Sequence, residues 1–169
     1  MAKIITAAEA ADLIRDGMTL GVSGFGAFAS PDYVMEAMSR KFKEQNTPRD
    51  LTIVSGVAPG DFVEDGCGLS KIKDEGIIKT LIASHLRMSP AIGRACSENK
   101  IAAFSMPLGV YGQLMNAIGG KRPGILTHVG LNTYADPRQD GCKMNELAKA
   151  DGRELVELIH VSGKDYLFY

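Results

Sequence analysis

The sequence has 169 residues, 45% of them hydrophobic, which is enough for one globular domain with a buried core. Its 19 basic and 20 acidic residues are interspersed and leave a formal net charge of −1, so no basic stripe is available for nucleic acid. The three cysteines lack a C-x-x-C pair, which favours a reducing, cytoplasmic location. No apolar run approaches the roughly 20 residues that span a membrane.

The predicted elements alternate between helices and strands. In chain order they are a helix at 7–15, strand 19–22, helix 31–44, strand 51–54, a short helix from 68 or 69, strand 77–83, helix 90–99, strand 101–105, helix 110–118, strand 125–129, a short helix at 146–149, and strands 155–160 and 166–169. Ser162-Gly163-Lys164 predicts a hairpin turn between the last two strands. The alternation predicts an α/β fold, an open, doubly wound, mostly parallel Rossmann-like sheet that ends in an antiparallel hairpin.

The segment 19–31, TLGVSGFGAFASP, leads from the first strand into the second helix. Gly24 and Gly26 let the backbone turn sharply and approach a ligand, and Ser30-Pro31 has the pattern of an N-cap followed by the first helical residue. The free N–H groups of a helix start favour an anion or an oxyanion. The order G-x-x-G-x-G is not the dinucleotide motif, so an ordinary strand-to-helix turn is an equal alternative.

Several consecutive strands end in glycine or proline loops, and ligands of such sheets lie beyond the carboxyl ends of the strands. The second strand ends in Ser55 rather than in the acid that holds a ribose, and Ser23 lacks the G-x-S-x-G setting of a nucleophile. The three histidines fall on separate elements, which argues against a metal site. His85 follows the third strand and is either a site residue or a structural imidazole. In Asp136-Pro137-Arg138, the arginine either binds an anionic ligand or stabilises its own loop.

As an ordered string, the residues resemble the family I coenzyme A transferases, in particular the acetate and propionate type. The blocks that carry the resemblance are Ser23-Gly24-Phe25, TPRDL at 47–51, ASH at 83–85, ENK at 98–100, KRPG at 121–124, GLNTYADPR at 130–138, KMN at 143–145 and DYLFY at 165–169. Their order and spacing over nearly the whole chain make the match specific. The resemblance implies that residues 1–169 form an amino-terminal CoA-transferase domain, which we expect to be truncated relative to the full enzyme.

The resemblance also implies reversible transfer of coenzyme A between an acyl-CoA and a short-chain carboxylate through a glutamyl-CoA thioester. Coenzyme A is then a substrate, and no bound cofactor or metal is implied. The family's nucleophilic glutamate lies in the second half of its chains, in a Glu-x-Gly setting that this sequence lacks; Glu64-Asp65-Gly66 is an accidental match elsewhere. We therefore expect no catalytic residue in this chain, no activity of the chain alone, a carboxy-terminal half or beta-type subunit as partner, and a homo-oligomer when complete.

For the substrate site, the resemblance implies that the opening loop forms part of the acyl pocket floor beside a neighbouring strand exit. The substrate-binding residues it indicates are Gly24, Phe25, Gly26, His85, Leu108, Gly109 and Thr133.

Three positions depart from the family pattern. Leu108 replaces a glutamine carried by many relatives, while Asn132 and Cys142 replace glycines. Leucine at position 108 would make that side of the acyl pocket apolar. The resemblance then predicts a substrate with a longer or more apolar acyl group. Two alternatives stay open, a Rossmann-like module that binds a nucleotide or sugar phosphate without transferase activity, and a truncated chain that acts only as an interaction piece.

Overall fold

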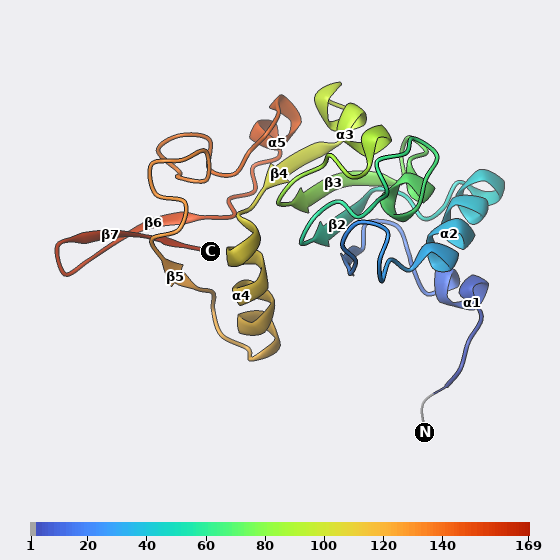
Figure 1. Cartoon of the computed structure of the whole chain (residues 1–169), viewed down its shortest axis with the longest axis horizontal. Coiled ribbons are helices and arrows are strands. Elements are labelled where there is room, and N and C mark those ends of the chain that lie inside the picture. Colours follow the sequence, from blue (N-terminus) through green and yellow to red (C-terminus); the bar gives the residue numbers. More distant parts are fainter. Residues whose placement is uncertain (1–2) are drawn as a thin grey trace.

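The computed structural model describes residues 3–169 and contains a parallel sheet of four strands in the order β1-β2-β3-β4 (Figure 1). The strands are β1 Thr19–Val22, β2 Leu51–Ser55, β3 Ile78–Ala83 and β4 Ala102–Ser105. Leu51, Ile53 and Leu81 on the two central strands have no exposed surface, as expected where both faces of a parallel sheet are covered. All four carboxyl ends therefore point toward the same edge.

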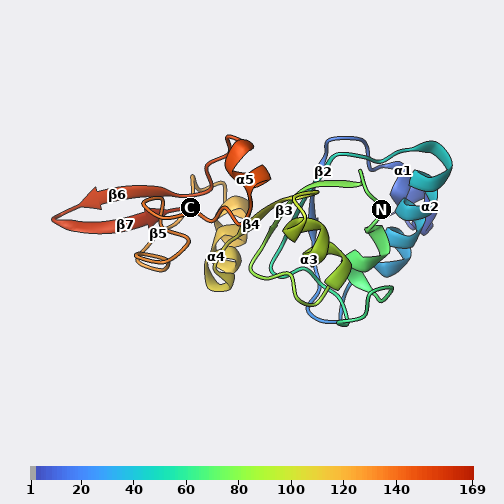
Figure 2. The same cartoon turned by 90° about the horizontal axis from the view of Figure 1, so that it is seen from above.

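The helices divide between two cores on either side of β4. They are α1 Ala7–Asp12, α2 Asp32–Gln45, the 3₁₀ helix η1 Gly68–Ile72, α3 Pro90–Ser97, α4 Leu108–Gly119 and α5 Glu146–Ala150. The first core, built around β1 to β3, includes Met35, Met38 and Ile92 from α2 and α3. Figure 2 shows α1 and α2 at one end of the molecule, α3, α4 and α5 nearer its middle, and the strands β6 Glu157–Val161 and β7 Lys164–Phe168 at the opposite end.

A second, antiparallel sheet has the order β5-β7-β6 and consists of β5 Leu126–Thr127, β6 Glu157–Val161 and β7 Lys164–Phe168. The β6–β7 hairpin projects from the body in both cartoon views (Figures 1 and 2). Its turn residues Ser162 and Gly163 have φ of +51° and +76°, the positive values that a two-residue type I′ turn requires. Leu167 and Tyr169 pack with Phe104 in the second core.

The α/β class, the parallel sheet and the closing antiparallel hairpin are confirmed. The predicted strand at 125–129 is shorter and joins the second sheet, because the free edge of β4 already pairs with the segment 142–144. There the Ser105 N–H donates to the Cys142 carbonyl at 2.8 Å, and the Met144 N–H donates to the Ala103 carbonyl at 2.9 Å.

Two predicted helix starts are wrong by one or two residues. Pro31, not Ser30, is the N-cap of α2, because the Val34 and Met35 N–H groups donate to the Pro31 carbonyl. Helix α4 begins at Leu108 rather than at 110, so Leu108 and Gly109 lie in its first turn and not in a loop. Within residues 3–169, none of the helices combines the length and apolar character needed to cross a membrane.

Candidate functional site

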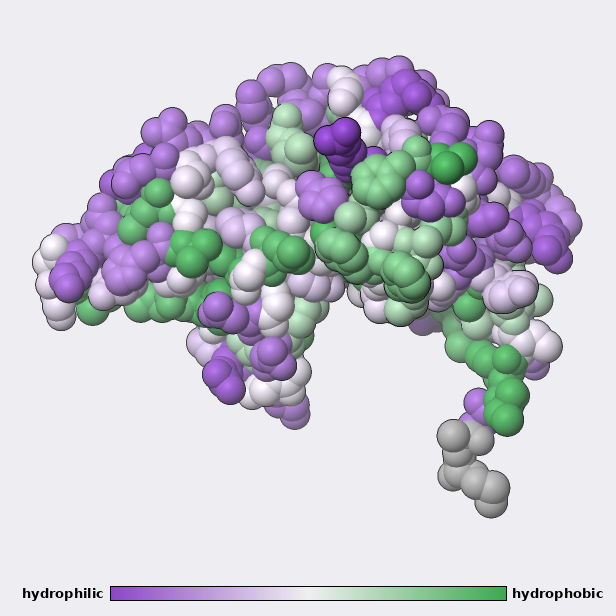
Figure 3. Space-filling view, in the orientation of Figure 1, coloured by the Kyte–Doolittle hydropathy of each residue, from purple (hydrophilic) through white to green (hydrophobic). Residues whose placement is uncertain are grey.

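The loop after β1 folds into a small hairpin at the carboxyl edge of the parallel sheet. The N–H groups of Phe25 and Phe28 each donate to the other residue's carbonyl at 3.1 Å. Gly26, the first residue between them, has φ +59°, which a type II′ turn demands at that position. Phe25 and Phe28 remain 58% and 80% exposed. Hydrophobic side chains gather over the loops at the strand tips in Figure 3.

The loop after β2, residues 56–60, packs against this hairpin. The Gly60 N–H donates to the Gly26 carbonyl at 3.1 Å. Gly24 has φ +125°, and a Cβ there would lie 3.2 Å from the Phe28 carbonyl oxygen and from the Pro59 Cβ. A Cβ on Gly60 would lie only 2.2 Å from the carbonyl oxygen of Met88. Glycine is therefore required where these loops meet, which explains part of the predicted Gly24–Gly26 pattern.

Leu108 lies at the other end of the same loop. A Cβ on Gly56 would meet the Leu108 Cδ1 and the Tyr111 ring at 3.3 Å, and Leu108 is 48% exposed. Residues 56–60 therefore run between Leu108 and the Gly24–Gly26 hairpin, a path that five residues limit to about 18 Å. Burial raises the pKa of Tyr111, so its phenol stays protonated at neutral pH. Gly109 faces open space, with nothing within 4 Å of an added Cβ.

Three serines tie the strand ends together, a feature that sequence reasoning missed. The Ser55 hydroxyl donates to the Val22 carbonyl at 2.8 Å, the Ser84 hydroxyl to the Gly56 carbonyl, and the Ser105 hydroxyl to the Ser84 carbonyl at 2.9 Å. Each hydroxyl thus bonds the chain leaving the preceding strand. The only available signal was a serine at or just after each of the four strand ends; the fourth, Ser23 after β1, donates to the Ala29 carbonyl of its own loop at 3.1 Å. We call Ser55, Ser84 and Ser105 the serine ladder.

His85 lies at this edge, but its contact there is made by the backbone. Its carbonyl accepts a hydrogen bond from the Ala58 N–H at 3.0 Å, which fastens the loop after β3 to the loop after β2. The imidazole is exposed, and no hydrogen bond to it occurs within residues 3–169.

Thr133 closes a turn. Its hydroxyl donates to the Gly130 carbonyl at 2.7 Å and accepts from the Ala135 N–H at 3.2 Å. None of the described contacts brings Thr133 to the Gly24–Gly26 hairpin. Its neighbour Tyr134 reaches the carboxyl edge instead, where its hydroxyl oxygen lies 3.4 Å from the Ser105 hydroxyl oxygen. Tyr134 is therefore a site candidate that sequence reasoning passed over.

The Asp136-Pro137-Arg138 segment is held by ion pairs within the chain, and we call the Asp136–Arg138–Asp165 group the staple. Arg138 donates from Nε and Nη2 to the Asp136 carboxylate at 2.9 and 2.7 Å, and from Nη1 to Asp165 on β7 at 2.9 Å. These hydrogen bonds hold the pKa of Asp136 well below its usual range, despite complete burial of the residue. The guanidinium is therefore occupied by two carboxylates of the chain itself, which leaves little of it for a ligand.

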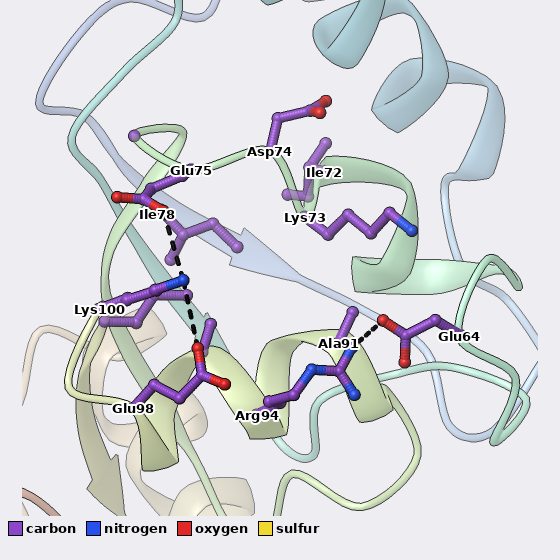
Figure 4. Close-up of a pocket in the computed structure, with 13 residues that line it drawn as sticks. Glu64, Ile72, Lys73, Asp74, Glu75, Ile78, Ala91, Arg94, Glu98 and Lys100 are labelled. Carbon is purple, nitrogen blue, oxygen red and sulfur yellow. Dashed lines mark hydrogen bonds and ion pairs between the residues drawn. The ribbon is translucent and has the colours of Figure 1, made fainter.

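A separate pocket of about 270 Å³ lies under α3, on the side where β3 and β4 begin (Figure 4). Five of its charged side chains pair with one another: Arg94 with Glu64, and Lys100 with Glu98 and Glu75 at 3.2 and 3.6 Å. Glu64, the accidental Glu-x-Gly residue, is thus held in an ion pair away from the carboxyl edge. Across residues 3–169, no three His, Cys, Asp or Glu side chains gather as a metal site would need.

The fold and the glycine-lined carboxyl edge define an α/β protein with a candidate site built largely from backbone. The chain belongs to the coenzyme A transferase family, whose model matches residues 4–169. It is 42% identical over 169 residues to a caffeate CoA-transferase of Acetobacterium woodii, covering 100% of this chain and 31% of that protein. It also resembles the apoenzyme structure of an acyl-CoA transferase (YdiF) of Escherichia coli O157:H7, with a TM-score of 0.90 and 35% identity, covering 98% of this chain and 32% of the other.

The chain spans about a third of the length of the first curated relatives it matches. Against a separate subunit, the acetate CoA-transferase subunit alpha of Escherichia coli K12, it is 28% identical over 134 residues, which cover 79% of this chain and 57% of that subunit. The matched region is therefore shorter than this subunit alone.

The two departures from family glycines both fall where the backbone is left-handed. Asn132 has φ +59° and Cys142 has φ +69°. Glycine is free of strain there, asparagine tolerates the conformation, and cysteine does not favour it. Cys142 is also fully buried, and burial raises the pKa of its thiol to about 12. Neither departure places a reactive group at the carboxyl edge.

Proposed function

We propose that this chain supplies the acyl-binding wall of an enzyme that moves coenzyme A between an acyl-CoA and a carboxylic acid. Membership of the coenzyme A transferase family supports the reaction class. The observation that carries the location is the loop 56–60, which contacts Leu108 at one end and the Gly24–Gly26 hairpin at the other. Such a surface offers shape and backbone dipoles rather than an activated nucleophile.

The covalent step then needs a glutamate from another part of the enzyme. Its carboxylate attacks the thioester carbonyl of the acyl-CoA, and the C–S bond breaks to give an acyl-glutamyl anhydride and the CoA thiolate. The thiolate attacks the glutamyl carbonyl, which releases the carboxylic acid and leaves a glutamyl-CoA thioester. The acceptor acid reverses these steps. The role of this chain is to hold the acyl group while charge develops at the carbonyl.

For the substrate, we propose an acyl group larger and more apolar than acetyl. Leu108 presents a half-exposed apolar side chain at the wall, and Phe25 adds an exposed aromatic ring at the hairpin. A caffeate CoA-transferase, named for an aromatic acid, is 42% identical to this chain.

The test of the reaction is to co-produce this chain with a polypeptide that covers the remaining two thirds of the caffeate-type relative. Acyl-CoA is added to the assembly, borohydride follows, and CoA exchange is then measured. We expect inactivation only when acyl-CoA precedes borohydride, because the glutamyl thioester is then present to be reduced. Exchange activity that survives this treatment would refute the covalent route. An assembly that binds nucleotide without exchange would support the binding-module alternative instead.

The test of the acyl preference compares acetate, butyrate and caffeate as acceptors for wild type and Leu108→Gln. We expect the variant to shift kcat/KM toward acetate by about tenfold relative to caffeate, because an amide replaces apolar surface. Ile118→Gln is the matched control, since Ile118 is also an exposed aliphatic residue of α4, 57% exposed, beyond the edge. An unchanged preference in Leu108→Gln would remove Leu108 from the acyl wall.

A further inference from the structure

The second sheet carries apolar side chains on the face that points away from the core. Leu167 of β7 is fully buried in the second core, so its neighbours Tyr166 and Phe168 lie on the opposite face of the sheet. The strand register places Ile159 opposite Tyr166 and Leu126 opposite Phe168 on that face. A solvated face of an antiparallel sheet normally carries polar residues at these alternate positions. We call Leu126, Ile159, Val161, Tyr166 and Phe168 the outer apolar face.

This outer apolar face is only partly covered by the chain itself. Leu126 and Val161 are 48% and 42% exposed, and the other three residues are half-buried. The Tyr166 ring lies against the exposed His128 ring, with 4.3 Å between their centroids. Only the end of β7 also pairs with β5, so most of the projecting hairpin in Figures 1 and 2 is a two-stranded ribbon. Such a ribbon is marginally stable in water unless something packs on it.

Two charged residues flank the outer apolar face at its opposite ends. Glu157 begins β6 and Lys164 begins β7, both are exposed, and the register separates them by four residues of strand, about 13 Å. Across residues 3–169, neither takes part in an ion pair or a side-chain hydrogen bond. On the inner side of the hairpin, by contrast, Asp165 is bound by His160 at 3.0 Å and by Arg138 at 2.9 Å. The outer face therefore presents two unpaired charges of opposite sign.

We propose that the outer apolar face binds a second copy of this chain, sheet against sheet, about a twofold axis that lies across the strands. Such an axis exchanges the two ends of the face, so Glu157 of each copy lies beside Lys164 of the other and the ion pair forms twice. A twofold axis along the strands would instead place Glu157 beside Glu157 and Lys164 beside Lys164. Like charges across an interface repel, so the charges select the first arrangement. Ile159 and Tyr166, opposite each other midway along the hairpin, then form the buried centre of the interface.

The interface is separate from the proposed function. The hairpin lies at the end of the molecule opposite α1 and α2 (Figure 2), and the outer apolar face shares no residue with the loops 23–30 and 56–60 of the carboxyl edge. Dimerisation is measured without acyl-CoA, so its outcome does not depend on the test of the transferase reaction.

The test is sedimentation equilibrium of the 169-residue protein, 18.1 kDa per chain, and of charge-reversal variants. We expect wild type to be a dimer. Glu157→Lys and Lys164→Glu should each weaken the dimer by about tenfold, because each change places two like-charged pairs across the axis. The double variant should return to within about threefold of wild type, because both pairs form again with their signs exchanged. Glu44→Lys, on an exposed residue of α2, is the matched control for net charge and should dimerise as wild type does.

Three results would overturn the proposal. The first is a wild-type protein that remains monomeric at about 100 μM, a concentration at which even a weak specific dimer is populated. The second is a dimer that both single reversals leave unchanged, or a double variant as weak as the single ones, because neither fits an axis across the strands. The third is a monomer whose assembly with the co-produced polypeptide is weakened by both reversals, which would assign the outer apolar face to that polypeptide. Circular dichroism spectra equal to that of wild type show that each variant is folded.

Discussion

Replacing Asp136 by asparagine removes the charge at the centre of the staple that joins the segment 130–144 to β7. The side chain is 1% exposed and accepts four hydrogen bonds, from Arg138 Nε, Nη2 and N–H and from the Asn132 N–H. Asparagine would turn an N–H₂ group toward donors and leave the guanidinium without its main partner. Breaking a buried ion pair destabilises a protein by about 3–5 kcal/mol. We take about 3 kcal/mol, because Arg138 is 43% exposed and keeps Asp165.

The assay is urea unfolding followed by circular dichroism. With a slope of about 2 kcal/mol per molar urea, a loss of about 3 kcal/mol lowers the midpoint by roughly 1.5 M. Asp140→Asn, on an exposed residue of the same segment, is the control and should leave the midpoint in place. A midpoint shift below about 0.3 M in Asp136→Asn would refute the assignment of a structural role to the staple.

The same pair fixes the direction of a pH effect. Arg138 lowers the pKa of Asp136 in the folded protein below the ordinary value of about 3.9. The unfolded chain therefore takes up this proton first, so the stabilisation is complete above about pH 5 and is lost as the pH falls through the folded pKa. The stability difference between wild type and Asp136→Asn should stay constant from pH 5 to 8 and shrink below pH 4. A difference that grows in acid would contradict this sign.

Three further predictions concern backbone and thiols. Asn132→Ala should cost about 1 kcal/mol in urea unfolding, because alanine is strained at φ +59°, whereas Asn132→Gly should stay within about 0.5 kcal/mol. Gly60→Ala should lower the free energy of unfolding by at least about 2 kcal/mol, because the new Cβ would lie 2.2 Å from the Met88 carbonyl oxygen. Gly109→Ala, whose Cβ would face open space, should leave it unchanged. Equal urea midpoints for the two variants would contradict the loop packing. Iodoacetamide at pH 8 should label Cys67 before Cys142, whose thiol has a pKa of about 12; equal rates would show that the second core opens.

The sequence predicted the elements well where local pattern decides them. The strand at 19–22 and the Ser162-Gly163 turn match the structure, because a short apolar run and a turn that needs positive φ are local properties. The strand at 125–129 is shorter than predicted and pairs with β7, a pairing that the sequence did not indicate, because partners depend on which edge is free and segment 142–144 pairs with β4. Leu108 was placed in a loop because Met106-Pro107 suggests an exit, yet proline precedes helices as readily as it ends strands.

The structure brings part of the predicted residue set together, and its role in substrate binding stays a prediction. Gly24, Gly26 and Leu108 all contact the loop 56–60, which the sequence analysis did not single out. The serine ladder could not be found, because hydrogen bonds between strand ends depend on register. Thr133 lies in a turn of its own, and only Tyr134 beside it contacts the edge.

The hydrogen bonds of the serine hydroxyls at the carboxyl edge bear on whether these residues can supply a nucleophile. Ser55, Ser84 and Ser105 all donate to carbonyls, so none is poised as a nucleophile beside a base. His85 is exposed, and its imidazole has no described hydrogen-bond partner that could be activated. The hydrogen bonds thus tie the strand ends together, and these residues supply no attacking group. The proposed function therefore takes its carboxylate from another part of the enzyme, and at this edge Phe25 and Phe28 are 58% and 80% exposed.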